Sequence, residues 1–151
     1  MCYCDGYSGL AIADYFIETA IAEKKSITNM HVLKIIYFAQ AFSFSELSRK
    51  LIKDDFYAWR FGPVEIHTYE EFKKYGASTI TSPSGKTNDE LIDIRKHADI
   101  VNFLNKLAVL IDANPFHLSN LSHIQGGPWY VTPLYHIIDY SKIKSFYGKK
   151  N

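Results

Sequence analysis

Histidine, cysteine and carboxylate side chains are the groups in this sequence that could bind a metal ion or transfer protons. His67 and Glu71 lie four residues apart, which places both on one face of a helix and could supply two metal ligands. No third ligand stands at a recognisable spacing, so a pair on the protein surface is the better interpretation. Cys2 and Cys4 alone can neither complete a zinc site nor build a disulfide framework. The sequence therefore predicts no metal site.

Catalysis by an acid, a base or a nucleophile is not indicated either. The remaining histidines are scattered along the chain: His31, His97, His117, His123 and His136. His123 precedes Pro128 and Trp129, and we expect its ring to hydrogen-bond to the backbone or to pack on an aromatic side chain. The sequence contains no glycine-rich phosphate loop and no nucleophile elbow. We therefore expect a protein that has no cofactor and is not an enzyme. A small metal-dependent hydrolase that uses His67, Glu71 or His123 is the alternative.

Aromatic residues make up 15% of the chain, and exposed ones would suit a protein-binding surface. Tryptophan, tyrosine and arginine are the residues that most often anchor interfaces. The candidate partner-binding residues are Trp59, Arg60, Phe61, Trp129 and Tyr130. Trp59 could equally fill the core beside a turn at Gly62 and Pro63, and the residues alone do not decide between these roles.

The net charge and the hydropathy of the chain argue against nucleic acid and membrane as partners. The formal net charge is only +1, and the lysines near the C-terminus are too few for strong phosphate binding, so we do not expect a nucleic-acid partner. These lysines are Lys142, Lys144, Lys149 and Lys150, with Tyr140 and Tyr147 among them. No apolar run reaches about 18 residues, and no basic segment followed by an apolar stretch marks a secretory signal. The cytoplasm, away from the membrane, is the expected location.

The composition fits one globular domain over residues 1–151, with 47% hydrophobic and 22% charged residues. Helical spacing of apolar residues dominates the chain. We therefore expect a mainly α fold, a compact bundle of about six helices around a buried central helix, and the sequence allows one short pair of strands. The ends, residues 1–7 and 148–151, are expected to fray.

The central helix is expected to run from its cap at Thr28 to about Phe44. It has hardly any polar face, and a helix that is apolar all round belongs in the middle of a domain. A first helix, from its cap at Ser8 to about Lys25, carries an apolar stripe that should pack on this core.

The segment from Ala58 to Gly76 is predicted to hold a turn and then an amphipathic helix. Gly62 permits unusual backbone angles, and Pro63 suits the first position of the helix. The apolar face consists of Ile66, Tyr69, Phe72 and Tyr75. The polar side consists of Glu65, Glu70, Glu71, Lys73 and Lys74, with Glu70 and Lys74 spaced for a weak ion pair. Gly76 stands where the helix should end.

The segments that join these elements are polar. Residues 46–55 are predicted to form a connector, residues 56–59 favour a short strand, and residues 79–88 should form an exposed, mobile loop.

Short helices are expected in the rest of the chain. Thr87 and Glu90 match a capping box that opens a helical stretch to Ile111, with a break near His97. A short helix is expected to begin at its cap Asn114, with Pro115 in the first turn. The last helix is expected to begin at its cap Asp139 and to end at Gly148.

Three segments, in this order, resemble the motifs of the Panacea domain family of SocA-like antitoxins and phage-associated proteins. They are residues 28–40, residues 58–76 and residues 118–129. The motif positions are Thr28, Lys34, Tyr37, Gln40, Gly62, Pro63, Tyr69, Phe72, Gly76, Leu121, His123 and Pro128. The resemblance extends from about Ala13 to Phe146. Asn29 and Ile66 depart from it, at positions where the family usually or often has proline.

The resemblance implies a function. Members of the family bind and neutralise partner toxins, and a member can also act as an adaptor that delivers its toxin to a protease. The implied function here is that of a phage- or prophage-associated antitoxin that neutralises a toxin by direct protein contact. An adaptor for a protease complex is the alternative. The resemblance also favours partner binding over core filling for Trp59 and its neighbours.

Overall fold

The computed structural model describes residues 3–148. The predictions for residues 1–2 and 149–151, which include Cys2, Lys149 and Lys150, lie outside these described residues. Within them the helices are α1 (Gly9–Ala22), α2 (Asn29–Leu47), α3 (Ile66–Phe72), α4 (Asn88–Arg95), α5 (Ala98–Leu107), α6 (Pro115–Ser122) and α7 (Tyr140–Tyr147), with 3-10 helices η1 (Lys73–Tyr75) and η2 (Ala108–Asp112). The strands are β1 (Phe56–Trp59), β2 (Gly62–Val64) and β3 (Ile137–Ile138). The predicted mainly α fold is confirmed.

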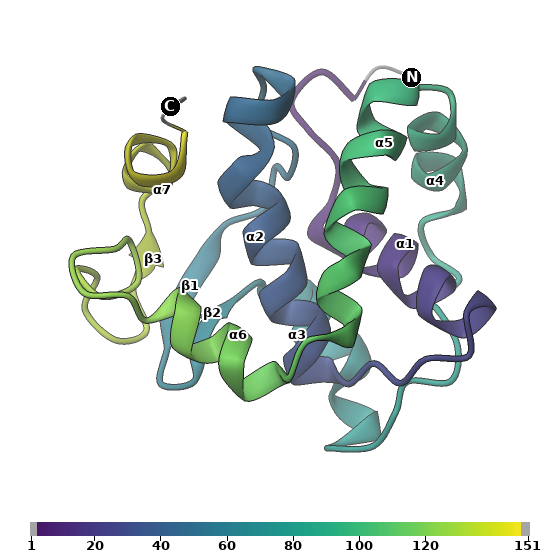
Figure 1. Cartoon of the computed structure of the whole chain (residues 1–151), viewed down its shortest axis with the longest axis horizontal. Coiled ribbons are helices and arrows are strands. Elements are labelled where there is room, and N and C mark those ends of the chain that lie inside the picture. Colours follow the sequence, from purple (N-terminus) through teal and green to yellow (C-terminus); the bar gives the residue numbers. More distant parts are fainter. Residues whose placement is uncertain (1–2, 149–151) are drawn as a thin grey trace.

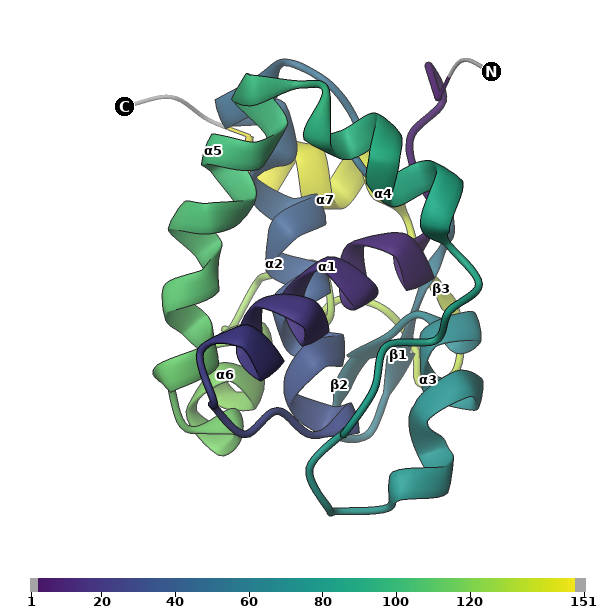
Figure 2. The same ribbon diagram turned by 90° about the vertical axis from the view of Figure 1, so that its right-hand side faces the viewer.

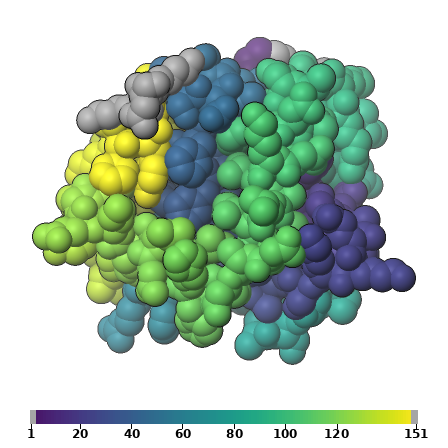
Figure 3. All heavy atoms as spheres, in the orientation of Figure 1, coloured from purple at the N-terminus to yellow at the C-terminus, as the bar shows by residue number. Residues whose placement is uncertain are grey.

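α2 runs through the middle of the molecule, with α5 on one side and α7 on the other (Figure 1). Every residue from His31 to Ala41 is buried, as expected for a helix that is apolar all round. Thr28 caps the helix by accepting a hydrogen bond from the His31 N–H. The C-terminal half of α2 is visible at the surface in a hollow between α5 and α7 (Figure 3). No helix within residues 3–148 combines the length and the hydropathy needed to cross a membrane.

Buried polar side chains tie α2 to the segments around it. The Gln40 amide donates to the Ile52 carbonyl at 2.8 Å and accepts from the Ile52 N–H at 2.9 Å, as a neighbouring strand would. His31 Nε2 lies 2.8 Å from the carbonyl oxygen of Leu110 in η2. These bonds satisfy polar groups that would otherwise destabilise the core.

α1 crosses α2 and carries a buried carboxylate that holds the loop of residues 79–88 (Figure 2). Asp14 accepts hydrogen bonds from the Ser84 N–H at 2.8 Å and from the Thr87 hydroxyl at 2.7 Å. Most of the loop is exposed, as predicted, but Ile80 and Thr87 are buried.

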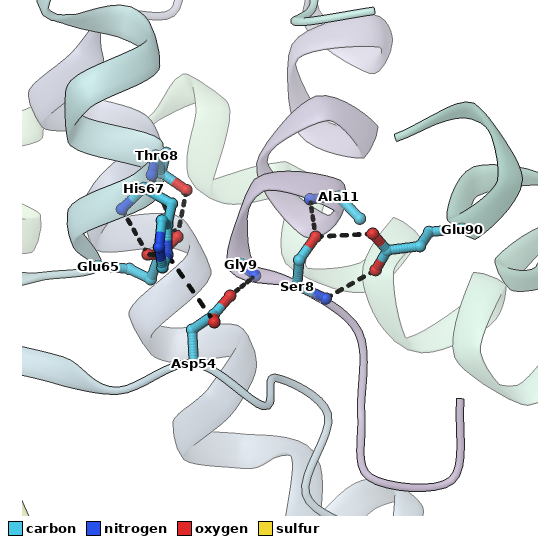
Figure 4. Close-up of polar contacts among 8 residues, drawn as sticks. All are labelled: Ser8, Gly9, Ala11, Asp54, Glu65, His67, Thr68 and Glu90. Atoms are coloured by element: carbon cyan, nitrogen blue, oxygen red, sulfur yellow. Dashed lines mark hydrogen bonds and ion pairs between the residues drawn. The ribbon is translucent and has the colours of Figure 1, made fainter. Parts of the chain in front are cut away.

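The predicted capping box at the start of α4 is wrong. The Thr87 side chain makes no cap bond, because its hydroxyl donates to Asp14. Glu90 instead accepts from the Ser8 N–H at 2.7 Å and the Ser8 hydroxyl at 2.9 Å (Figure 4). Ser8 in turn caps α1 through the Ala11 N–H, as predicted. The two side chains therefore join α4 to α1.

The sheet is antiparallel, with the strand order β2-β1-β3. Pro63 was predicted to open the helix, but it lies in β2 opposite Ala58. Pairing with β1 keeps the chain extended here, so α3 begins only at Ile66 with Glu65 as its cap. Glu65 was assigned to the polar side of the helix, but it is only 1% exposed.

The ion pairs at the end of α3 also differ from the prediction. Glu70 pairs with Lys73 and Glu71 pairs with Lys74, at 2.5 and 3.8 Å, instead of Glu70 with Lys74. The chain changes to the 3-10 helix η1 at Lys73, and residues three apart eclipse in such a helix.

Hydrogen bonds are made near both described ends of the chain, to α4 at the N-terminal end and within α7 at the C-terminal end. Tyr7, within the segment for which fraying was predicted, is buried, and its hydroxyl donates to Asp93 at 2.6 Å. Asp139 caps α7 through the Ser141 N–H, and Gly148 follows the helix, both as predicted.

Candidate protein-interaction site

β1 and β2 form a hairpin, and Trp59 pairs with Gly62 across it, so Arg60 and Phe61 form its tip. Gly62 has a φ of +120°, a region that residues with a Cβ rarely adopt. A Cβ here would lie 2.7 Å from Lys34 Cε and 2.9 Å from Ser122 Oγ. Glycine therefore allows α2 and α6 to close against the hairpin.

α6 holds the two carbonyls of the tip. The Ser119 hydroxyl donates to the Phe61 carbonyl at 2.6 Å. His123 Nε2 lies 3.2 Å from the Arg60 carbonyl oxygen, and its Nδ1 is hydrogen-bonded to the Ser119 carbonyl. The His123 ring also packs on Trp129, with ring centroids 3.7 Å apart. His123 thus makes both types of contact predicted for it.

Trp129 holds the hairpin at its β1 end. Its indole Nε1–H donates to the Trp59 carbonyl at 2.8 Å. The Trp59 ring packs edge-on against Tyr69 of α3, with ring centroids 4.9 Å apart. Trp59 and Trp129 are both partly buried, so each supports the hairpin as well as bordering the surface.

Lys34 holds the hairpin from beneath. Its side chain is 1% exposed, and its ammonium donates to the Pro63 carbonyl at 3.1 Å. Burial lowers the pKa of Lys34 to about 8, because the charged form loses its hydration. A buried lysine bonded to a backbone carbonyl therefore fixes β2 against α2.

This burial predicts a pH-dependent stability. Between pH 8 and about pH 10.4 the unfolded chain keeps a proton on Lys34 that the folded chain has released, so stability rises with pH. From pH 7 to pH 9 the free energy of unfolding should increase by about 1 kcal/mol relative to Lys34→Met. Buried tyrosines such as Tyr7, whose pKa is raised by burial, act in the opposite direction above about pH 10 and are common to both proteins.

Urea unfolding of the wild type and of Lys34→Met at pH 7, 8 and 9 measures this difference. Parallel pH profiles for the two proteins would contradict a depressed pKa at Lys34.

The five predicted partner-binding residues divide into exposed and supporting residues. Phe61 is 64% exposed, Tyr130 is 55% exposed, and Arg60 is also exposed. Trp59 and Trp129 are partly buried, and the indole N–H of Trp129 donates to the Trp59 carbonyl. The structure therefore brings Trp59, Arg60, Phe61 and Trp129 together at one hairpin.

A pocket of about 190 Å³ lies between this hairpin, the first turns of α2 and the end of α3. Its walls include Trp59, Phe61 and Tyr69, with Gly76 at the end of η1. Asn29 also lines it, and the Asn29 Oδ1 has no hydrogen-bond partner among the described residues. The pocket could receive an apolar side chain of a partner.

His67 and Glu71, the pair weighed as metal ligands, point to different partners. Glu71 pairs with Lys86 at 2.6 Å. His67 lies beside Glu65 and Asp54, and one ligand atom from each of these three residues lies within 4.8 Å of the others (Figure 4). This grouping was not predicted, because Asp54 belongs to the connector before β1.

The two carboxylates of this group accept hydrogen bonds at the starts of helices, so both act as helix caps (Figure 4). Glu65 accepts from the His67 N–H at 2.7 Å, the Thr68 N–H at 3.2 Å and the Thr68 hydroxyl at 2.7 Å. Asp54 accepts from the Gly9 N–H at the start of α1, at 2.8 Å. Carboxylates are favoured at helix N-termini, so the group serves to position α3 and α1.

Sequence reasoning missed Glu65 and Asp54 as structural groups and gave Ser119 no role at the hairpin. A glutamate directly before a helix whose third residue is threonine was the available signal for Glu65. Asp54 and Ser119 act on residues 45 and 58 positions away, which no local pattern indicates.

Comparison with known proteins adds a family relationship. The sequence profile described as "Antitoxin SocA-like, Panacea domain" matches residues 32–130, which include the hairpin, α6 and Trp129. The curated protein Antitoxin SocA of Caulobacter vibrioides (strain NA1000 / CB15N) is 27% identical over 125 residues. The aligned region covers 79% of this chain and 66% of that relative. No solved structure matches the chain at a significant level.

Proposed function

This chain belongs to the Antitoxin SocA-like, Panacea domain family, and from that premise we propose that it neutralises a partner toxin by direct protein contact. The proposal includes a phage or prophage setting for the gene and a cytoplasmic complex. It involves no cofactor and no catalytic step.

The presentation of Arg60 and Phe61 is the observation that supports this proposal best. Side chains from the first and third motif segments bond to the backbone of the hairpin, which belongs to the second, and the two tip side chains stay exposed. Binding hot spots are enriched in aromatic residues and arginine, and a tip that is already held loses little conformational entropy on binding. The residues of the motif segments therefore hold the hairpin so that Arg60 and Phe61 are presented to a partner.

The pocket beside the tip fits the same role. Trp59 and Tyr69 supply aromatic walls, between which an apolar side chain of the toxin could insert. Phe61 forms part of the wall and of the exposed tip, so tip and pocket would act as one contact surface.

The test is a titration of the toxin encoded by the neighbouring reading frame with this purified protein. Toxin activity should fall in proportion to the protein added and reach its minimum at a fixed molar ratio, independent of incubation time. The matched control is the double variant His67→Ala, Glu71→Ala, which should inhibit as the wild type does. His123 is unsuitable as a control, because it contacts the Arg60 carbonyl.

Two results would contradict the proposal. Complete inactivation at a small molar fraction, growing with incubation time, would indicate an enzyme. Rescue of growth that disappears in a strain lacking energy-dependent proteases, without inhibition in the purified mixture, would indicate a proteolytic adaptor.

A further inference from the structure

Arg60, at the tip of the hairpin, is a cation without a counterion in the described part of the chain. Its side chain is exposed, and no described carboxylate lies within ion-pair distance of it. The other two arginines are both bound within the protein. Arg49 donates to the Tyr3 carbonyl at 2.9 Å, and Arg95 pairs with Glu18 at 2.8 Å. The guanidinium donors of Arg60 are therefore left for a partner.

The surface that surrounds the tip offers no free acidic group. On one side lie α6 and the segment after it, and residues 113–138 contain no Asp, Glu, Lys or Arg. On the other side lies α3, where Glu70 and Glu71 each pair with a lysine, at 2.5 and 2.6 Å. Glu65 is buried as the cap of the same helix. The acids before β1, residues 54 and 55, lie at the end of the hairpin opposite its tip.

A second cation lies beneath the same hairpin. The Lys34 ammonium donates to the Pro63 carbonyl, and no described carboxylate lies within ion-pair distance of it. Its pKa, lowered by burial to about 8, leaves most molecules charged at pH 7. The hairpin thus carries two positive charges that no nearby acid balances, and a negative group on the partner is their electrostatic complement.

Contact with Phe61 would also dehydrate Arg60, because the two residues are adjacent at the tip. Phe61 is 64% exposed and forms part of the wall of the neighbouring pocket. A partner that covers Phe61 and enters this pocket displaces water from the guanidinium beside it. A dehydrated charge without an acceptor costs free energy, so the partner has to supply one. A carboxylate fits best, because it accepts two parallel hydrogen bonds from the planar fork of arginine.

We propose that the partner toxin presents the carboxylate of an aspartate or glutamate to Arg60, beside the apolar side chain that enters the pocket. The inference rests on the proposed function and deepens it, because it gives the chemistry of the toxin segment that the tip recognises. Arg60 is then the residue that determines specificity, whereas Phe61 supplies apolar contact area.

Charge substitutions at Arg60 test this contact in calorimetric titrations of the purified toxin from the neighbouring reading frame. The affinity should fall from the wild type to Arg60→Gln and further to Arg60→Glu. The loss for Arg60→Glu should be at least about a hundredfold, because like charges then face each other. Lys96→Glu is the matched control, because Lys96 is exposed directly after α4, away from the hairpin (Figure 1). It changes the net charge equally and should leave the affinity nearly unchanged in 0.15 M salt, which screens distant charges.

Compensating charge reversal identifies the toxin group. Each Asp and Glu of the toxin is replaced in turn by Arg, and one of these variants should bind Arg60→Glu more tightly than the unchanged toxin does. The Arg60 side chain makes no hydrogen bond or ion pair with the described chain, so its variants should melt as the wild type does. If Arg60→Glu melts early, a weaker salt dependence of the affinity of Arg60→Gln tests the same contact.

A folded Arg60→Glu that binds the toxin as tightly as Lys96→Glu would overturn the proposal and leave toxin neutralisation standing. So would a full set of toxin reversals in which none improves binding to Arg60→Glu. A wild type that forms no complex with the toxin would overturn the proposed function and this contact together.

Discussion

Replacing Ile36 with alanine is expected to lower the free energy of unfolding by about 2–5 kcal/mol. Ile36 is fully buried in the middle of α2, which α1, α5, α6 and α7 all contact. The truncation removes apolar contacts and leaves a cavity that the surrounding helices can fill only in part. In a chain of this length each kcal/mol corresponds to about 2–4 °C in melting temperature.

A thermal melt and a urea titration of Ile36→Ala measure this loss. The same substitution at Ile92, which is 55% exposed on α4, is the control and should change stability by less than about 0.5 kcal/mol. A melt of Ile36→Ala that matches the wild type would mean that α2 is not the core of the fold.

The features predicted correctly are those that nearby residues determine. α2 was predicted from its continuous apolar character, which leaves burial as the favourable environment. The caps at Ser8, Thr28, Asn114 and Asp139 were predicted because each side-chain oxygen bonds to an N–H two or three residues later.

The errors arise where distant residues compete with the local pattern. Pro63 fits the start of a helix, but pairing with β1 places it in a strand. Thr87 fits a helix cap, but the buried carboxylate of Asp14 takes its hydroxyl. β3 has only two residues and forms because it meets the edge of β1, so its own sequence gives little signal.

The candidate site was predicted in its residue types and only partly in its arrangement. Aromatic and arginine content made Trp59, Arg60 and Phe61 candidates for partner binding, because these residue types commonly anchor interfaces. The separation into an exposed tip and its supports depends on bonds from α2, α6 and Trp129. These bonds cross long stretches of chain, so only the family motifs hinted that the segments belong together.

Replacing Phe61 with alanine should weaken the complex with the toxin by at least about 2 kcal/mol, roughly thirtyfold in affinity. Phe61 is 64% exposed, so the substitution removes little packing within the free protein. The Ser119 hydroxyl bonds to the Phe61 carbonyl and not to its side chain, so the tip should keep its position. The loss would then report the contact itself, and Arg60→Ala should act in the same direction.

Ile92→Ala is the control for this variant, because Ile92 is a similarly exposed apolar residue on α4, away from the hairpin (Figure 1). Thermal melts of both variants should match the wild type, which separates a binding defect from unfolding.

The most direct test is isothermal titration calorimetry of the purified toxin with the wild type, Phe61→Ala and Ile92→Ala. Direct contact through the hairpin tip predicts a complex of fixed stoichiometry, an affinity at least about thirtyfold lower for Phe61→Ala, and no change for Ile92→Ala. A folded Phe61→Ala that binds the toxin as tightly as the wild type would contradict the account.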